Sequence, residues 1–455
     1  MLNRLHFTNF KSWPEADLAC SRITGMFGRN SSGKSSLIQF LLLLKQTKDA
    51  TDRKLSLDLN GSLVQLGTIR DTIHQHDEKR AIEIEVSFDL DSELALSDPS
   101  RASGSIIASG SRITMTSTVA VEKNAPVARK LAYVLGEMRF GLEPRAGSSS
   151  QFRLQAAAVA PARSAFSFTR NPGRAWPLPG PVKSYAFPDQ ARTYYQNAGF
   201  LSYLEVEYEA ALDQIFYLGP LREPPKRDYL WARSRPSDVG QRGERAIDAI
   251  VAATEAGEKR NPRPKTRLVP FQQMIASLLR DMGMVESFTV TEIAAGSNRW
   301  QARVRTRPRA SEVLLTDVGF GVSQVLPVVT LLQYVPEGAT VILEQPEIHL
   351  HPLAQAGLAD VIIQAAQHRR VQVILESHSE NLLLRLQRRI AEGAISSDDV
   401  KLYFCDAPDG VSTLTPLEVD LFGRILNWPE KFMGDAFAET AQAERARLER
   451  MNAAE

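Results

Sequence analysis

The sequence predicts an α/β protein whose mainly parallel sheet is assembled from two distant parts of the chain. Three observations predict this class. An apolar run at residues 23–27 is followed by a glycine-rich turn and a helical pattern at 36–45. From about residue 311 to 394, strand and helix patterns alternate, as they do in parallel sheets. Between these parts, apolar and polar residues alternate within 81–157, which predicts antiparallel strands.

The glycine-rich turn at residues 28–35 reads GRNSSGKS and has the GxxxxGK[ST] spacing of a phosphate-binding loop. Its glycines let the backbone wrap an anion, and the N–H groups of the loop and of the following helix point at the anion's oxygens. The lysine reaches the β- and γ-phosphates, and the serine hydroxyl takes one site on Mg²⁺. The sequence therefore predicts binding of ATP or another nucleoside triphosphate with Mg²⁺. The predicted contacts are Gly28, Arg29, Asn30, Ser31, Ser32, Gly33, Lys34, Ser35 and Ser36.

Composition predicts an ordinary globular protein. The 455 residues are 43% apolar and 24% charged, which suits two or three folded domains. Cys20 and Cys405 are the only cysteines, so we expect a reducing, cytoplasmic compartment. The N-terminus lacks the apolar core of a signal peptide and no apolar stretch approaches the length of a bilayer span, so no membrane association is expected.

The middle of the chain predicts antiparallel strands at 81–90, 113–121, 130–142 and 151–157. Residues 101–200 carry 13 Lys/Arg against 4 Asp/Glu, interleaved with aromatic residues between 166 and 195. Two interpretations stay open. The segment binds a nucleic-acid strand or an acidic protein through this charge and these rings, or the rings form a small core of their own.

The remaining patterns predict helices at 201–216, 244–256 and 271–282, strands at 287–293 and 300–306, and a polar helix at 437–451 that is exposed or docks. The sequence has no sustained heptad repeat, so no long coiled-coil arm is expected. The predicted domains are 1–95, with the phosphate loop; 96–215, with antiparallel strands and the basic, aromatic insert; 216–310, a helical and β insert returning to the first part; 311–435, the C-terminal part of the parallel sheet; and 436–455, an exposed helix.

A second group of motifs follows in the C-terminal part. Residues 339–352 read ATVILEQPEIHLHP, an apolar strand that ends in carboxylates, and we assign Glu344 as the Mg²⁺ ligand opposite Ser35. Residues 317–327 read DVGFGVSQVLP, a Gly/Ser turn that opens a helix and predicts another anion site. A strand at 371–376 is followed by Ser377 and His378, which places an imidazole at a strand's end.

The order of these motifs resembles the head of an ATP-binding-cassette (ABC) ATPase. More closely, it is similar to the cytosolic branch with RecF, the SMC heads and the overcoming-lysogenization-defect (OLD) ATPases. The phrases VILEQPEIHLHP, GFGVSQVLP, ILESHSENLLLRL and YLGPLREPP resemble the OLD-like group most. The resemblance covers residues 1–95 and 215–435. It implies an ABC-type P-loop ATPase head, with a mixed or parallel sheet, flanking helices and an antiparallel β subdomain, interrupted by a central insert.

The resemblance also implies composite sites. Residues 317–324 fall in the signature segment that closes on the γ-phosphate of the opposite subunit, through Gly321, Ser323 and Gln324. His351 falls in the turn that contacts the partner's site, and His378 takes the place of the switch histidine. Two heads would sandwich two ATP molecules, so dimerisation is coupled to nucleotide.

One departure from the family's pattern concerns hydrolysis. The family motif ends in Asp-Glu, with the Asp on Mg²⁺ and the Glu activating water, whereas this chain has Glu344 and Gln345. An amide orients a water but cannot accept its proton, so slow hydrolysis is expected. Glu347 lies two residues further on and is the alternative group for activating water. The expected catalytic residues are Lys34, Glu344, Gln345, Glu347 and His378.

The resemblance leaves two functions open. OLD-like relatives often carry a nuclease domain, but the acidic residues after His378 lack the compact grouping of a two-metal nuclease, so no nuclease activity is expected. The first function is an ATP-driven sensor or scaffold that controls a separate effector, such as a nuclease, in bacterial anti-phage defence. The second is a RecF-like ATPase that binds DNA in repair or replication. A transporter motor, a GTPase and a kinase fit the motifs poorly.

Overall fold

A six-stranded sheet forms the centre of the protein in the computed structural model, which describes residues 1–98, 105–148, 150–159, 166–173, 176–261, 266–429 and 442–447. Its strand order is β19-β18-β3-β17-β16-β9, and all neighbours except β19 pair in parallel. The bounds are β3 (Ile23–Gly28), β9 (Ile215–Leu218), β16 (Thr340–Glu344), β17 (Gln372–Glu376), β18 (Val400–Asp406) and β19 (Thr413–Leu417). The predicted assembly from distant segments is confirmed.

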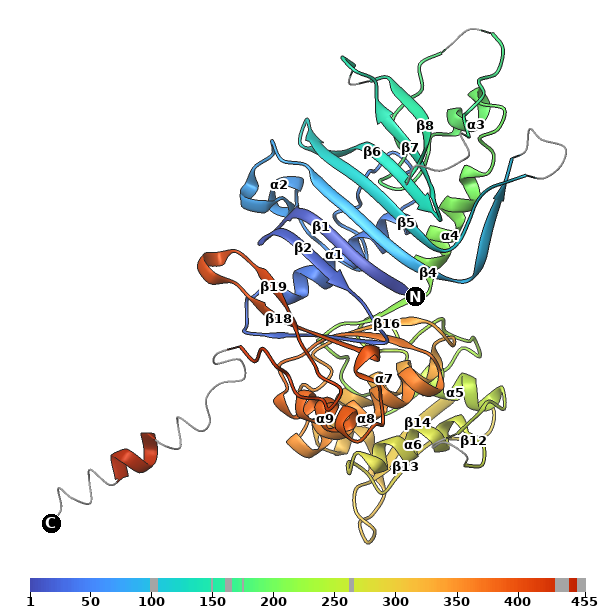
Figure 1. The fold of residues 1–455 in the computed structure, drawn as a ribbon. Coiled ribbons are helices and arrows are strands. Elements are labelled where there is room, and N and C mark those ends of the chain that lie inside the picture. Colours follow the sequence, from blue (N-terminus) through green and yellow to red (C-terminus); the bar gives the residue numbers. More distant parts are fainter. Residues whose placement is uncertain are drawn as a thin grey trace.

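The parallel strands read as unbroken apolar runs because both faces of this sheet are covered. Ile342 and Ile374 belong to a core shared with the first helix and the antiparallel sheet. Their neighbours Val341 and Val373 belong to the core of the helical lobe. The six-stranded sheet therefore lies between two other layers, with the antiparallel sheet on one side and the helices on the other (Figure 1).

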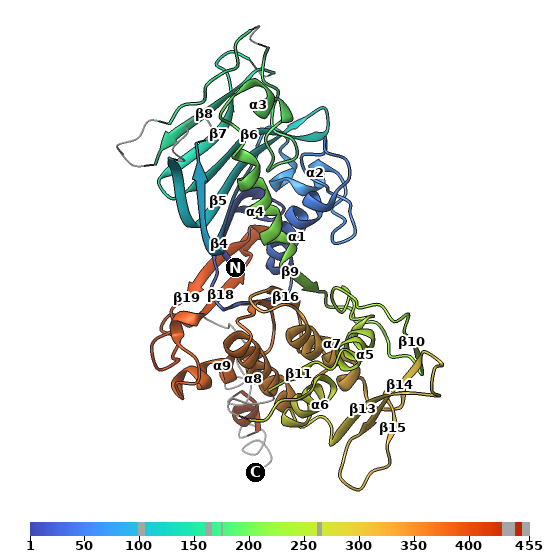
Figure 2. The ribbon, with the colours of Figure 1, turned by 90° about the vertical axis from the view of Figure 1, so that its right-hand side faces the viewer.

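The antiparallel sheet has seven strands in the order β2-β1-β4-β5-β6-β7-β8. Helices α1 and α4 contact each other, and α4 packs along β4 and β5 (Figure 2). The single strand expected at 130–142 is instead a hairpin, because Gly136 takes a positive φ of 55° in its turn. The bounds are β1 (Leu2–Phe10), β2 (Trp13–Ala19), β4 (Ile82–Ser97), β5 (Ile106–Glu122), β6 (Ala125–Leu135), β7 (Met138–Pro144), β8 (Phe152–Ala158), α1 (Lys34–Asp49), α2 (Ile69–Thr72), α3 (Asp189–Tyr194) and α4 (Leu201–Asp213).

The aromatic residues of the basic insert pack inwards. Phe166 and Phe168 pack edge-on against each other and against Phe140, and Phe200 contacts Phe166 edge-on and stacks on Phe168. Among the described rings of the insert, Trp176 is 52% exposed, whereas Tyr185 and Phe187 are buried. The interpretation in which the rings form a core is confirmed, although this core is continuous with that of the antiparallel sheet. The buried rings are not available for stacking on bases.

The helical lobe covers the other face of the parallel sheet and carries a small antiparallel sheet at its outer end (Figure 2). Its helices are α5 (Ala246–Glu255), α6 (Phe271–Asp281), α7 (Phe320–Tyr334), α8 (Pro352–His368) and α9 (Glu380–Ala391). Its short strands are β10 (Tyr229–Leu230), β11 (Lys259–Arg260), β12 (Val269–Pro270), β13 (Ser287–Glu292), β14 (Arg299–Arg305) and β15 (Val313–Leu314).

The predicted fold class, an α/β protein with a mainly parallel sheet, an antiparallel β subdomain and a central insert, is confirmed. Of the polar helix predicted at 437–451, residues 442–447 are helical and the rest lie outside the described residues. Within the described ranges, none of the helices combines the length and the apolar character that crossing a bilayer requires.

The contact between β3 and β18 gives the first prediction. Gly28 ends β3 with φ 145°, and a Cβ there would lie 2.1 Å from the Cys405 carbonyl oxygen. Gly173 also has a positive φ, 120°, but no atom lies within 4 Å of its Cβ position. We expect Gly173→Ala to cost about 1–3 kcal/mol of unfolding free energy from backbone strain alone. Gly28→Ala should cost about 2 kcal/mol more, because it also forces two chain segments apart.

Urea unfolding of the nucleotide-free protein measures both losses. Equal losses of unfolding free energy for the two variants would show that the β3–β18 contact adjusts to the added Cβ without strain.

Candidate phosphate-binding and hydrolytic site

The phosphate loop and the polar residues that end β16 and β17 lie at the carboxyl edge of the parallel sheet, where ligands bind in open α/β folds. The register of β16 and β17 places Glu344 opposite Glu376, and the register of β17 and β3 places Glu376 opposite Met26. The phosphate loop after β3, the turn after β16 and the segment after β17 therefore leave the sheet side by side. Strand β17 lies between the other two.

The phosphate loop is held from outside by residues distant in sequence. Trp13 donates its indole N–H to the Gly33 carbonyl at 3.0 Å. Gly33 has φ 91°, and a Cβ there would lie 2.4 Å from the Ser412 hydroxyl. Helix α1 begins directly after the loop with no side-chain N-cap and no acidic residue in its first turn. Its N-terminal N–H groups and dipole are therefore available to an anion.

Lys34 points into the hollow of the loop. Its Nζ donates to the Gly28 carbonyl at 3.1 Å, to the Arg29 carbonyl at 2.6 Å and to the Ser32 hydroxyl at 3.3 Å. Burial lowers the pKa of Lys34, while the nearby Glu376 carboxylate acts in the opposite direction. The ammonium rests on neutral acceptors, so a phosphate oxygen would be its stronger partner.

A cleft of about 450 Å³ lies over the loop. It brings the predicted loop residues 30–36 together with Gln345 and His378, whereas Gly28 and Arg29 do not line it. Two further residues, Ser12 and Glu376, line it and were missed by the sequence analysis. The lining residues are Ser12, Asn30, Ser31, Ser32, Gly33, Lys34, Ser35, Ser36, Gln345, Glu376 and His378.

Glu376 is the carboxylate nearest to the loop's serine. It is 3% exposed, and the Ser35 hydroxyl donates to its Oε2 at 2.8 Å. Burial raises its pKa, and hydrogen bonding from Ser35 and the charge of Lys34 act against that rise. The signal that could have found it is its place as the last residue of a strand that ends at the same sheet edge.

Glu344 lies one strand further from the loop. The Tyr217 hydroxyl donates to its Oε1 at 2.9 Å. Burial, and then the charge of Glu376, raise the pKa of Glu344 to about 7. Glu347 is also buried, and burial raises its pKa. Its Oε1 accepts the His378 backbone N–H at 2.7 Å, whereas its Oε2 has no partner among the described residues.

These carboxylates fit a divalent cation. Three buried carboxyl groups have raised pKa values, chiefly because burial disfavours their charged forms. No cage of three or more His, Cys, Asp or Glu side chains is found in the described part of the chain. Mg²⁺ at a phosphate site needs only one or two carboxylates, since phosphates and waters supply the remaining ligands. Ser35, together with Glu344 or Glu376, would hold it.

The turn after β16 decides which side chain can meet an attacking water. Gln345 has φ 44° and His349 φ 64°, both left-handed conformations that non-glycine residues adopt only under constraint. The Gln345 N–H donates to the Glu376 carbonyl at 2.9 Å. This geometry places Gln345 in the cleft, while the Glu347 carboxyl turns to the backbone of His378. Partial burial and the charge of Lys34 lower the pKa of His378, so its imidazole is neutral at pH 7.

The residues of the signature segment lie outside this cleft. Ser323 is only 6% exposed, and its hydroxyl donates to the Phe320 carbonyl of its own helix at 2.8 Å. The exposed end of the segment is formed by Gly319 and Phe320, the latter 72% exposed, with Gly321 half-buried and Gln324 half-buried one turn further. The Ser323 side chain therefore does not face outwards, where a partner's nucleotide would lie, because it falls on the buried side of α7.

His351 is exposed and begins α8, where its Nδ1 accepts the Leu353 N–H at 3.4 Å. Leu353 itself is 66% exposed. A Cβ on Gly321 would lie 3.4 Å from the His349 carbonyl oxygen, so the start of α7 packs against the turn that precedes α8. The start of the signature segment and His351 therefore lie next to each other on the surface of the protein.

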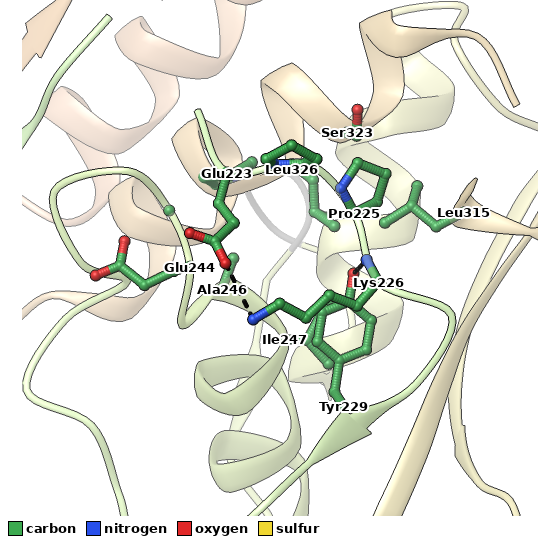
Figure 3. A pocket seen from close by; sticks show the side chains of 13 residues that line it. Glu223, Pro225, Lys226, Tyr229, Glu244, Ala246, Ile247, Leu315, Ser323 and Leu326 are labelled. Atoms are coloured by element: carbon green, nitrogen blue, oxygen red, sulfur yellow. Dashed lines mark hydrogen bonds and ion pairs between the residues drawn. The ribbon is translucent and has the colours of Figure 1, made fainter. Parts of the chain in front are cut away.

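Behind Ser323 lies a small cavity, between α7, α5 and the loop that carries Glu223 and Lys226 (Figure 3). Its volume is about 30 Å³, enough for about one water molecule. Glu223 and Lys226 form an ion pair of 3.0 Å at its wall. Tyr229 accepts the Lys226 N–H at 3.0 Å. This space is too small for a second nucleotide.

Arg222 is a buried cation behind the carboxylates. Only its Nη2 has a hydrogen-bond partner, the Glu344 carbonyl at 3.5 Å, and within the described residues its Nε and Nη1 have none. Burial lowers the pKa of Arg222 to about 10, and the charges of Tyr217, Glu344 and Glu347 act against this. An incompletely bonded guanidinium is expensive to bury, so its place next to Glu344 and Glu347 indicates a role in the site.

Comparison with known proteins agrees with a nucleotide-binding role for the phosphate loop. Residues 1–137 match a model described as "AAA ATPase domain", and residues 225–385 match "AAA domain, putative AbiEii toxin, Type IV TA system". Residues 395–442 match "Protein of unknown function (DUF3696)". No curated protein matches the sequence. The two ATPase matches cover the phosphate loop on one side and the signature segment, β16 and β17 on the other. Two separate parts of the chain are therefore similar to AAA ATPase domains, which supports a P-loop ATPase.

Solved structures similar to this chain include SMC heads. An SMC head bound to the C-winged helix domain of ScpA is 11% identical with a TM-score of 0.45, covering 92% of this chain and 98% of that chain. The SMC head domain from Thermotoga maritima is 12% identical, with a TM-score of 0.42 and coverages of 92% and 99%. An SMC head with an extended coiled coil, bound to the C-terminal domain of ScpA derived from Pyrococcus furiosus, is 10% identical. Its TM-score is 0.43, and the match covers 92% of this chain and 96% of that chain.

The raised pKa of Glu344 predicts a pH dependence of stability. Its pKa is 4.5 ordinarily and about 7 in the fold, so the folded state holds this proton more tightly than the unfolded state. The folded state therefore loses stability as pH rises through this window, by up to about 3 kcal/mol. In Glu344→Gln this loss should disappear. Chemical unfolding of the metal-free and nucleotide-free protein, from about pH 5 to about pH 8, measures the difference between variant and wild type. Parallel curves would show that Glu344 titrates normally.

Two buried arginines give a matched comparison. Arg369 donates to the Leu332 and Val335 carbonyls at the end of α7, and burial lowers its pKa to about 10, as in Arg222. Arg369→Met leaves those carbonyls unpaired, so we expect a loss of about 2 kcal/mol or more of unfolding free energy with normal turnover of the folded protein. Arg222→Met should change stability by less than about 1 kcal/mol, yet lower turnover at least about tenfold.

Denaturant unfolding and phosphate release measure the two effects. If Arg222→Met destabilised the fold like Arg369→Met and left turnover unchanged, Arg222 would be structural.

Proposed function

We propose that this chain is an ATPase that binds ATP tightly, hydrolyses it slowly, and joins two heads around the bound nucleotide. The observation that carries this proposal is the cleft over the phosphate loop, in which Lys34, Ser35, Glu376, Gln345 and His378 converge. The loop, the carboxylates and the neutral imidazole of this cleft match the needs of a triphosphate with Mg²⁺.

The chain's own residues divide the work. Lys34 leaves the loop carbonyls for the β- and γ-phosphates, and the α1 N-terminus binds their oxygens. Ser35 and a buried carboxylate at this sheet edge would hold Mg²⁺, which when bound neutralises charge on the phosphates. Gln345 orients the attacking water by hydrogen bonding and cannot take its proton. His378, being neutral, serves as a hydrogen-bond partner near the γ-phosphate.

The proposed partner face is the surface that carries Gly319, Phe320, His351 and Leu353. Phe320 and Leu353 are large apolar side chains that are mostly exposed, and such residues are enriched in contact surfaces. The glycines flanking Phe320 let the start of α7 approach a partner's phosphate closely, and the helix N-terminus favours an anion. In this composite site, one protomer supplies the loop and its twin supplies the start of α7.

We propose that the joined heads act as a sensor or scaffold that controls a separate effector, such as a nuclease, in bacterial anti-phage defence. Supporting this proposal are the OLD-like motifs and the match at residues 225–385 to a family named after a putative AbiEii toxin. Slow hydrolysis suits such a switch, because the ATP-bound assembly then lasts long enough to hold an effector in one state.

The alternative is a RecF-like ATPase that binds DNA in repair or replication. The excess of Lys and Arg in residues 101–200 favours it, but most described rings of that segment are buried. Salt-sensitive DNA binding that strengthens with ATP would support this alternative, whereas stable copurification with a nuclease or another toxic effector would support the scaffold.

The lifetime of the assembly tests the proposal. Native mass measurement with ATP and Mg²⁺ should show wild-type dimers that persist, and Lys34→Ala should stay monomeric without turnover. Gln345→Glu restores a proton acceptor, so it should release phosphate at least about tenfold faster and lose its dimers correspondingly sooner. Turnover of Gln345→Glu no faster than wild type would contradict the assigned role of Gln345.

A surface variant supplies the control for the dimer. Phe320→Asp should bind ATP as well as wild type but form no dimer, whereas Leu421→Asp should behave as wild type. Leu421 is a suitable match because it is 77% exposed and lies elsewhere, in the segment after β19. Dimers that form equally well with Phe320→Asp would rule out this face.

A further inference from the structure

We propose that Glu376 is the carboxylate that holds the divalent cation together with Ser35, and that Glu344 acts behind it. This inference rests on the proposed ATPase function and assigns a metal ligand that the sequence analysis did not assign. It departs from the sequence-based assignment, in which Glu344 at the end of the apolar strand 340–344 took this place. The reason lies in the order of the strands.

The order of the strands sets the distances. Strand β17 lies between β3 and β16, so the residue next to the phosphate loop is the last residue of β17. Glu376 accordingly lines the cleft, and its Oε2 lies 2.8 Å from the Ser35 hydroxyl. Two neighbouring oxygens around an octahedral Mg²⁺, each at about 2.1 Å from the ion, are about 3 Å apart. The two side chains are therefore already spaced as adjacent ligands.

The contacts of Glu344 point away from the loop. Its Oε1 accepts the Tyr217 hydroxyl at 2.9 Å, and Tyr217 comes from β9, on the far side of β16. Glu344 is absent from the lining of the cleft. Its interaction with Glu376 is electrostatic, across the paired ends of β16 and β17. Glu344 thus acts as a positioning residue, which adds negative charge behind Glu376 and holds Tyr217.

The test compares Glu376→Gln with Glu344→Gln through nucleotide affinity, which does not depend on turnover. Calorimetric titration with a non-hydrolysable ATP analogue gives the dissociation constant with Mg²⁺ and again with excess chelator. The ratio of the two constants is the gain due to metal. We expect Glu376→Gln to lose at least about tenfold of this gain and to keep the metal-free affinity. Glu344→Gln should keep the gain within about threefold.

Two additions keep the test decisive. In Glu376→Gln the amide oxygen can still accept the Ser35 hydroxyl, so the fold is expected to survive. Glu376→Asp provides a second variant that should retain part of the gain. Mn²⁺ titration followed by its paramagnetic resonance, in the presence of ADP, reports metal binding directly and should show the same ranking.

The outcomes separate the two proposals. A wild-type protein that binds no nucleotide, or binds it as well after Lys34→Ala, would overturn the proposed function. A wild type with a clear gain due to metal that Glu376→Gln leaves intact and Glu344→Gln abolishes would overturn this inference alone. Equal losses in both variants would also overturn it, because the carboxylates would then share the ion.

Discussion

The parallel pairing of β3, β17 and β16 is the constraint on which the site depends. It ends three strands at one edge of a sheet that is buried on both faces. Because the middle strand is β17, Glu376 meets Ser35 and Glu344 is set one strand back. The loop conformation depends on the same sheet, since Gly28 lies against Cys405 of β18 without room for a Cβ. The cleft is thus a consequence of strand order before any ligand arrives.

This arrangement gathers acidic groups in the free protein with little positive charge beside them. Burial raises the pKa values of Glu344, Glu347 and Glu376, while Lys34 donates to loop carbonyls and two nitrogens of Arg222 have no partner among the described residues. Such a site is unfavourable on its own and becomes favourable when a cation and phosphates enter. In the function that we propose, this binding energy would hold two heads together, and Gln345 would delay its release.

The sequence predicted the local parts of this site well, because they are local in physical origin. The phosphate loop follows from spacing, and β16 and β17 follow from apolar runs that end in polar residues. Strand order is not local, so Glu376 was missed, and so was Ser12 from the turn between β1 and β2. The hairpin at 125–144 was taken for one strand because both of its arms are apolar. Ser323 was assigned outwards because the motif does not fix which face of α7 is buried. The aromatic residues of the insert pack inwards because they bury the apolar face of the long antiparallel sheet.

The central claim, that uncompensated buried carboxylates wait for a divalent cation, has a direct thermodynamic test. A preformed complex of Mg²⁺ with a non-hydrolysable ATP analogue is titrated into the protein near pH 7, in buffers of different ionisation enthalpy. The dependence of the measured heat on the buffer gives the number of protons exchanged. The account predicts net release of protons, because Glu344, whose pKa is about 7, ionises further when the cation arrives. Binding with no proton exchange, or with proton uptake, would contradict it.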